Sequence, residues 1–122
     1  MIGYVTVGTN DLEKACAFYD TLLGEFGYQR ILEDGDFVAW GTNLMEPGFS
    51  VTKPFDGNAA SVGNGVMIAL RMESPEQVDA CYARAIELGG SDEGPPGQRG
   101  EGFYAGYFRD LDGNKLNAFV MG

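Results

Sequence analysis

The feature that most constrains the fold of this chain is an approximate internal repeat of about 63 residues. Shifting the second half back by this interval places Met67 on Tyr4. The same shift places Tyr82 on Tyr19, so strand-like and helix-like patterns recur in one order. Because the period is too long for a solenoid, it favours two copies of one supersecondary unit. The length of 122 residues fits a single domain built from two similar halves.

The first half has the pattern of a strand, a helix and three further strands. Residues 2–7 alternate as a strand does, and a stripe of apolar residues three and four apart predicts a helix after them. Asn10 and Glu13 are the residue types of a capping box at its start, and Gly24 lies near its end. Three strands are predicted at 27–32, 37–41 and 48–53, with turns at 34–35 and 47–48.

The second half repeats this order. A strand is predicted at 66–70, and Ser74, Pro75 and Gln77 predict the start of a helix that ends at Gly89-Gly90. Two strands, 103–109 and 116–121, flank Asp112-Gly113, a pair typical of a hairpin turn. The Gly- and Pro-rich stretch 92–102 is predicted as a long mobile loop, and such loops often act as lids.

Both halves therefore predict a βαβββ unit. Repeat one would span residues 1–54 and repeat two residues 65–122, with a linker at 55–64 inside one domain, 1–122. A single unit leaves one sheet face without a helix. The predicted fold class is α+β, with the two repeats pairing into a curled mixed sheet that has a concave interior and one helix per repeat on the outside.

The composition excludes several kinds of site. The chain has no histidine, so it cannot build an imidazole-based metal cage, a catalytic triad or an imidazole general base. Its formal net charge of −10 argues against a nucleic-acid groove or an anionic membrane surface as partner. Cys16 and Cys81 fall in the predicted helices and are interpreted as small core hydrophobes rather than a disulfide.

The N-terminal residues show neither a basic segment nor a long apolar run, so no secretory signal is predicted. No stretch approaches the roughly 20 apolar residues of a membrane span. The expected location is therefore the cytoplasm.

Two segments resemble a known family. The first is NDLE at 10–13 followed by AFY at 17–19, and the second is RDLDGNK at 109–115 with Leu111 where the family has proline. In this order across two βαβββ halves, they resemble the vicinal oxygen chelate superfamily. That superfamily includes glyoxalase I, bleomycin-resistance proteins and extradiol dioxygenases. The resemblance covers nearly the whole chain and implies the same fold and a homodimer.

The resemblance also identifies the positions at which metal-dependent members hold a divalent ion, where they typically use two histidines and a glutamate. The matching residues here are Tyr4, Met67 and Asn117. Tyr4 would have to ionise from a pKa near 10, Met67 offers a neutral thioether, and Asn117 offers a neutral carbonyl oxygen. We therefore expect no metal cofactor.

Strand alternation suggests which side chains line the interior. If Tyr4, Met67 and Asn117 face inward, so does Phe119, and the family resemblance favours Tyr107 on the same side. The register of the first half is less constrained, and there we expect interior positions for Trp40, Phe49 and Lys53. The predicted ligand-binding residues are Tyr4, Trp40, Phe49, Lys53, Met67, Tyr107, Asn117 and Phe119. Plain core packing remains an alternative for the aromatic residues, as does a solvated edge position for Lys53.

Aromatic rings with a few polar groups suit a small amphipathic molecule, and ring faces also suit a cation. The preferred function is metal-free binding of a small amphipathic or hydrophobic molecule, for which catalysis is not required. No catalytic residue is identified. Two alternatives stay open: a lyase or dioxygenase-type enzyme with an atypical site, and a non-catalytic dimeric subunit.

Overall fold

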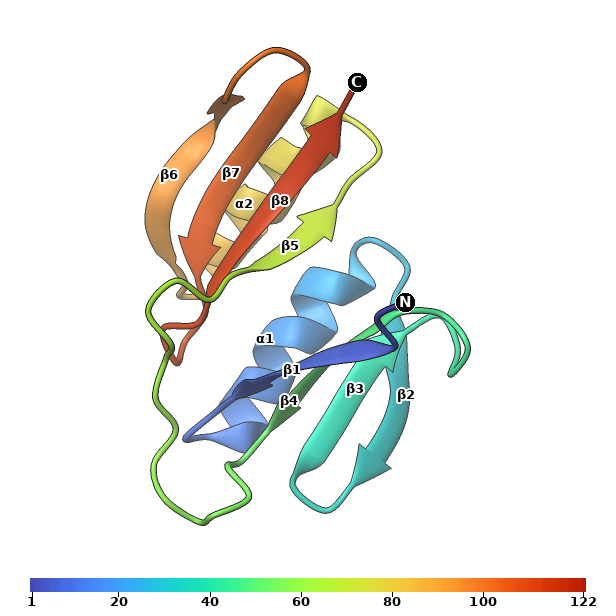
Figure 1. The fold of residues 1–122 in the computed structure, drawn as a ribbon, viewed down its shortest axis with the longest axis vertical. Helices are drawn as coiled ribbons and strands as arrows, with labels where there is room; N and C mark the ends of the chain where they lie inside the picture. The colour runs from blue at the N-terminus through green and yellow to red at the C-terminus, as the bar shows by residue number, and fades with distance from the viewer. The chain divides into compact units, whose positions relative to one another are not determined.

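The computed structural model describes residues 1–122, which form two compact units, Met1–Val62 and Gly63–Gly122. Each unit is described by itself. Each contains one helix and one four-stranded mixed sheet in the order βαβββ (Figure 1). The two predicted repeats and the α+β class are confirmed, whereas the shared concave interior stays a prediction.

The first unit consists of β1 (Tyr4–Gly8), α1 (Leu12–Gly24), β2 (Gln29–Asp34), β3 (Phe37–Gly41) and β4 (Gly48–Thr52). Its sheet has the strand order β1-β4-β3-β2. The outer strand β1 runs parallel to β4, and the other neighbours are antiparallel. Helix α1 packs on one face of this sheet (Figure 1).

The second unit consists of β5 (Ile68–Arg71), α2 (Pro75–Glu87), β6 (Ser91–Gln98), β7 (Phe103–Arg109) and β8 (Lys115–Met121). Its order, β5-β8-β7-β6, is the same arrangement, with β5 parallel to β8. The helices α1 and α2 both have 13 residues, and their first residues, Leu12 and Pro75, lie 63 positions apart. Neither helix has the length and hydrophobicity that crossing a bilayer requires.

The predicted start of α1 is wrong by one residue. The N-cap is Asp11, whose carboxylate accepts from the Lys14 amide at 3.1 Å. Asn10 is engaged elsewhere, because its amide group exchanges two hydrogen bonds with the backbone of Ala60, at 2.7 and 3.2 Å. The predicted cap of α2 is confirmed, since Ser74 Oγ accepts from the Gln77 amide at 3.2 Å.

The predicted loop and lid at 92–102 are wrong, because most of this stretch is strand β6. It pairs with β7 over Ser91–Gln98, interrupted by two bulges around Gly94. β6 is an outer strand, where a proline without an N–H group is tolerated. The bulges absorb the Gly-Pro-Pro-Gly sequence within the sheet.

The hairpin between β7 and β8 is confirmed and is organised by Asp110. This buried carboxylate accepts from the backbone amides of Asp112 and Asn114, both at 2.9 Å, and from Asn114 Nδ2 at 3.0 Å. Gly113 has a φ of +90°, which glycine adopts without strain. The segment that resembles the family is therefore a turn whose buried carboxylate is hydrogen-bonded within the turn itself.

Asp20 fixes α1 to the first sheet. Trp40 on β3 is 1% exposed, and its indole N–H donates to Asp20 Oδ1 at 2.9 Å. Arg30 on β2 donates to the same carboxylate through Nε at 2.9 Å and Nη2 at 2.8 Å. The hydrogen bonds from Arg30, and secondarily that from Trp40, hold the pKa of Asp20 below its ordinary value.

Replacing Asp20 tests this attachment. Asp20→Ala leaves the buried Trp40 N–H without a partner and should lower the free energy of unfolding by about 1–3 kcal/mol. Asp20→Asn keeps an oxygen for Trp40 and Arg30 Nε, but it loses the charge and the acceptor for Arg30 Nη2. Because this pair is partly exposed, the change should cost about 0.5–1 kcal/mol. Because Trp40 is the sole tryptophan, denaturant titration followed by its fluorescence measures both. Glu46→Ala, which removes an exposed loop carboxylate, is the control.

The same pair of proteins has a defined pH dependence. The folded Asp20 carboxyl has the lower pKa, so its charge stabilises the native state above the unfolded value of about 3.9. This contribution is lost as the pH falls through the folded value. The stability difference between wild type and Asp20→Asn should therefore be full at pH 7 and shrink below about pH 4. A difference that grows on acidification would contradict the assignment.

Candidate functional site

Each sheet has one face covered by its helix and one that its helix leaves free. In the second unit Phe108, Leu116 and Ala118 are fully buried on the α2 side. Strand alternation and the printed register then place the neighbouring side chains on the opposite face. We call this the helix-free face of the second sheet; it carries Ala69, Arg71, Phe103, Ala105, Tyr107, Arg109, Lys115, Asn117, Phe119 and Met121.

Asn117 is the unusual residue on this face. It is 2% exposed, and its carbonyl oxygen Oδ1 is buried without a hydrogen-bond partner. Its cross-strand neighbours are Tyr107 on β7 and Ala69 on β5. A buried acceptor left without a donor costs about 1–3 kcal/mol, so such groups in native proteins call for an explanation.

The first unit offers an internal comparison for Asn117. Under the 63-residue shift Ala69 corresponds to Thr6, which pairs with Ser50 as Ala69 pairs with Asn117. Ser50 is also buried, but its hydroxyl lies 2.7 Å from Thr6 Oγ1 and donates to the Val5 carbonyl at 2.8 Å. The first half therefore satisfies its central polar group, and the alanine at position 69 removes the matching partner from the second half.

Aromatic rings and cations lie around Asn117 on the helix-free face. Phe103 and Phe119 stack with their ring centres 5.6 Å apart. The guanidinium of Arg99 lies 5.5 Å from the centre of the Tyr107 ring, and the ammonium of Lys115 lies 5.7 Å from it. Tyr107, Asn117 and Phe119 are thus brought together as predicted. Met67 lies just before β5 and is 39% exposed.

The predicted residues of the first unit divide between two faces. Tyr4 is 63% exposed and meets Phe37 edge-on, with ring centres 5.9 Å apart, on the face opposite α1. Trp40 and Phe49 lie on the other face and pack against Tyr19 from α1. Their ring centres lie 5.8 and 4.5 Å, respectively, from that of Tyr19. The prediction that both side chains face the helix-free interior was therefore wrong, because they point to the opposite face of the sheet. There the Trp40 indole N–H donates to Asp20 on α1.

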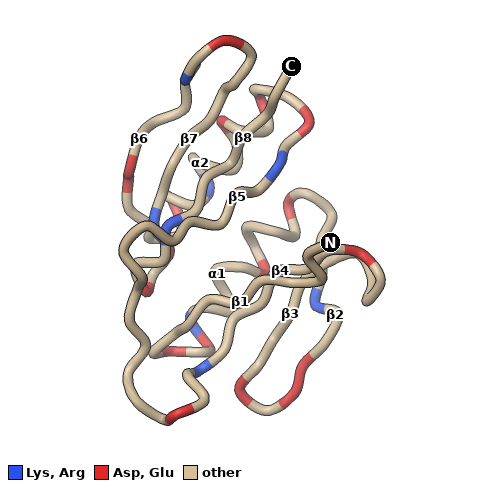
Figure 2. The backbone as a smooth tube through the Cα atoms, viewed as in Figure 1, with Lys and Arg blue, Asp and Glu red and all other residues tan.

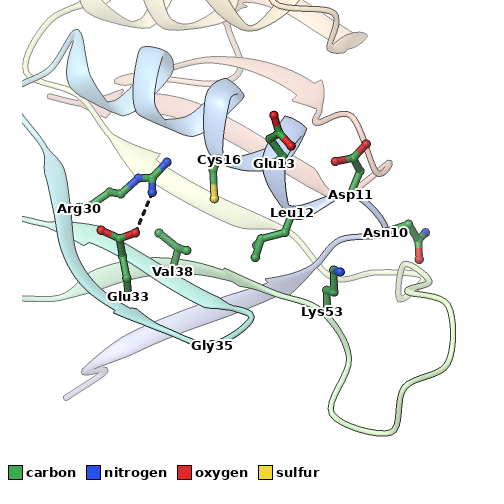
Figure 3. A pocket seen from close by; sticks show the side chains of 10 residues that line it. All are labelled: Asn10, Asp11, Leu12, Glu13, Cys16, Arg30, Glu33, Gly35, Val38 and Lys53. Atoms are coloured by element: carbon green, nitrogen blue, oxygen red, sulfur yellow. Dashed lines mark hydrogen bonds and ion pairs between the residues drawn. The ribbon is translucent and has the colours of Figure 1, made fainter.

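Lys53 follows β4 and lines a pocket of about 550 Å³ beside the start of α1 (Figure 3). The Cys16 thiol points into this pocket from α1, and burial raises its pKa. Both cysteines are free and buried, as predicted. Sequence reasoning missed this pocket, for which Lys53 was the only signal. The lining residues are Asn10, Asp11, Leu12, Glu13, Cys16, Arg30, Glu33, Gly35, Val38 and Lys53.

The residues at the expected metal positions do not fit a divalent ion. Tyr4 lies in the first unit, and Met67 and Asn117 in the second. Their donors are a phenol, a thioether and a neutral amide oxygen, none of which matches the carboxylate and imidazole ligands that these ions prefer. The structure also holds no group of three His, Cys, Asp or Glu residues arranged to bind a metal.

Comparison with known proteins decides the family. The model of the glyoxalase/bleomycin resistance protein/dioxygenase superfamily matches residues 1–118. The chain belongs to this superfamily. A glyoxalase/bleomycin resistance protein from Albidiferax ferrireducens T118 is 38% identical, covers 100% of this chain and 99% of its own, and superposes with a TM-score of 0.92.

More distant solved structures share the fold. The hypothetical protein SA1046 from S. aureus is 25% identical, with a TM-score of 0.76 over 98% of this chain and 92% of its own. A lactoylglutathione lyase from Agrobacterium tumefaciens is 21% identical, with a TM-score of 0.71 over the same shares of the two chains, and shows the fold alone. No curated protein matches this chain.

The state of Asn117 predicts an unusual stability change. Asn117→Leu removes the buried oxygen without a donor, so it should raise the free energy of unfolding by about 1 kcal/mol and the melting temperature by about 4 °C. Asn114→Leu is the contrasting control, because the Asn114 amide bonds Asp110 and its loss should destabilise the protein by about 1 kcal/mol. Thermal unfolding measures both. Equal destabilisation by the two changes would mean that Asn117 is satisfied.

Proposed function

We propose that this superfamily member binds a small amphipathic molecule on the helix-free face of its second sheet, without a resident metal ion. The observation that carries the proposal is the buried Asn117 oxygen that has no donor within the protein. An N–H or O–H group of a ligand would donate a hydrogen bond to this oxygen. We expect the protein to act in the cytoplasm as a homodimer, as the family resemblance implies.

The surroundings of Asn117 suit the apolar part of such a ligand. The stacked rings of Phe103 and Phe119 lie on the same face, and Phe119 is two residues along β8 from Asn117. Binding sites for small molecules commonly combine apolar and aromatic side chains with a few placed polar groups. The ligand's apolar part would cover the rings while its donor reaches Asn117.

The donors available support the proposed independence from metal. Asn117 can accept a hydrogen bond as a neutral amide, and this role needs no ion. Tyr4 and Met67 supply neither a carboxylate nor an imidazole. Binding through a hydrogen bond and apolar contact is therefore the chemistry that these side chains support best.

N-phenyl-1-naphthylamine is a suitable probe, because it is neutral, carries two aromatic groups and has a single N–H donor. Its fluorescence should rise on binding to the wild-type protein, and added chelator should leave the affinity unchanged. Asn117→Leu should weaken binding about tenfold, the equivalent of one lost hydrogen bond. Asn64→Leu, at an exposed position in the predicted linker, should leave the affinity unchanged.

A second variant tests the same oxygen without altering Asn117. Ala69→Thr introduces the hydroxyl that Thr6 supplies at the equivalent position of the first unit. It should donate to Asn117 Oδ1, raise the free energy of unfolding and weaken binding of the probe. Ala69→Val, of the same shape without a hydroxyl, is its control. Probe affinity that is equal in Asn117→Leu and wild type would overturn the proposal, as would binding or turnover that requires added Mn²⁺, Fe²⁺, Ni²⁺ or Zn²⁺.

A further inference from the structure

Three cations at the helix-free face of the second sheet, Arg71, Arg99 and Lys115, form no ion pair with a carboxylate, and two of them approach the same aromatic ring. With 18 acidic and 8 basic residues, carboxylates are abundant (Figure 2). Arg30 pairs with two of them, and Arg84 and Arg109 pair with one each, at 2.6–3.0 Å. Arg99 and Lys115 instead lie against the ring of Tyr107.

The backbone holds the Arg99 side chain over the bulged strand β6. Its Nη2 donates to the Pro95 carbonyl at 2.5 Å. A Cβ atom added to Gly97 would lie 2.9 Å from Arg99 Nη1, and one added to Gly94 would lie 3.3 Å from Nη2. The two glycines of the Gly-Pro-Pro-Gly sequence therefore leave the space that the guanidinium occupies.

Lys115 completes the group from β8. Tyr107, which both cations approach, is the cross-strand partner of Asn117. Directly paired residues in antiparallel strands have Cβ atoms about 5 Å apart. The two cations and the unsatisfied oxygen therefore lie within reach of one small molecule.

We infer that the ligand of this face is an anionic amphipath, whose carboxylate, sulfonate or phosphate group lies between Arg99 and Lys115 while a neighbouring N–H or O–H donates to Asn117. The inference rests on the proposed function. A cationic ligand, which aromatic rings alone would permit, would meet two like charges at Tyr107. An anion would be paired by both.

A matched pair of probes separates the ligand's charge from its apolar part. 8-Anilinonaphthalene-1-sulfonate has the same rings and N–H as N-phenyl-1-naphthylamine and adds one sulfonate. The wild-type protein should bind the sulfonate probe more tightly than the neutral one. Arg99→Gln and Lys115→Gln should each weaken the sulfonate probe about fivefold and change the neutral probe less than twofold.

Two further variants exclude indirect effects. Lys14→Gln changes the net charge by the same amount at an exposed position on α1, and it should leave both probes unaffected. Gly97→Ala displaces the guanidinium without removing it, so it should weaken the sulfonate probe in the same direction as Arg99→Gln. Circular dichroism of each variant checks that the fold is retained.

The outcomes distinguish the two proposals. Equal affinity for both probes in the wild type, or a preference for the sulfonate that survives Arg99→Gln and Lys115→Gln, overturns the anionic ligand. The proposed function then still stands if the neutral probe depends on Asn117. Failure of the wild type to bind either probe overturns both proposals.

Discussion

The alternation of side chains along each strand is the constraint on which the rest of this structure depends. Because successive residues point to opposite faces, covering one face with a helix commits every second residue to the core. In the first unit this commitment is secured by Trp40, whose buried indole N–H requires an acceptor and finds it in Asp20 on α1. The residues that alternate with those facing α1 lie on the other face of the sheet. They include Tyr4 and Thr6 on β1 and Ser50 on β4.

Much of the fold could be predicted from this periodicity and from local capping chemistry. The two helices, their 63-residue offset and the hairpin after Arg109 follow from apolar spacing, Ser74 and the Asp-Gly turn. Strand β6 could not be predicted, because glycine and proline usually indicate a loop, and only pairing with β7 shows that bulges accommodate them. The misplaced cap at Asn10 has a similar cause, since its partner Ala60 is 50 residues away.

For the candidate site, the sequence indicates which strand residues share a face, but not which polar and charged groups there lack partners. Alternation from Asn117 placed Phe119 on the same face, and the family resemblance placed Tyr107 there; the regular hairpin of β7 and β8 agrees with both. The face of Trp40 was misjudged, because periodicity fixes which residues share a face and not which face meets the helix. The unpaired oxygen of Asn117 and the stacking of Arg99 on Tyr107 depend on three-dimensional neighbours that no spacing encodes.

The difference between the two halves is more informative than their similarity. The same backbone position carries a hydroxyl at Thr6 and a methyl at Ala69, and only the first can satisfy the polar residue across from it. If polar groups on these faces served stability alone, the second half would be expected to satisfy its own, as the first does with Ser50. A buried acceptor kept without a donor is a stability cost of the kind that binding sites carry, and Arg99 and Lys115 lie on the same face. This asymmetry is the reason that we propose the second sheet, rather than the first, as the ligand-binding face.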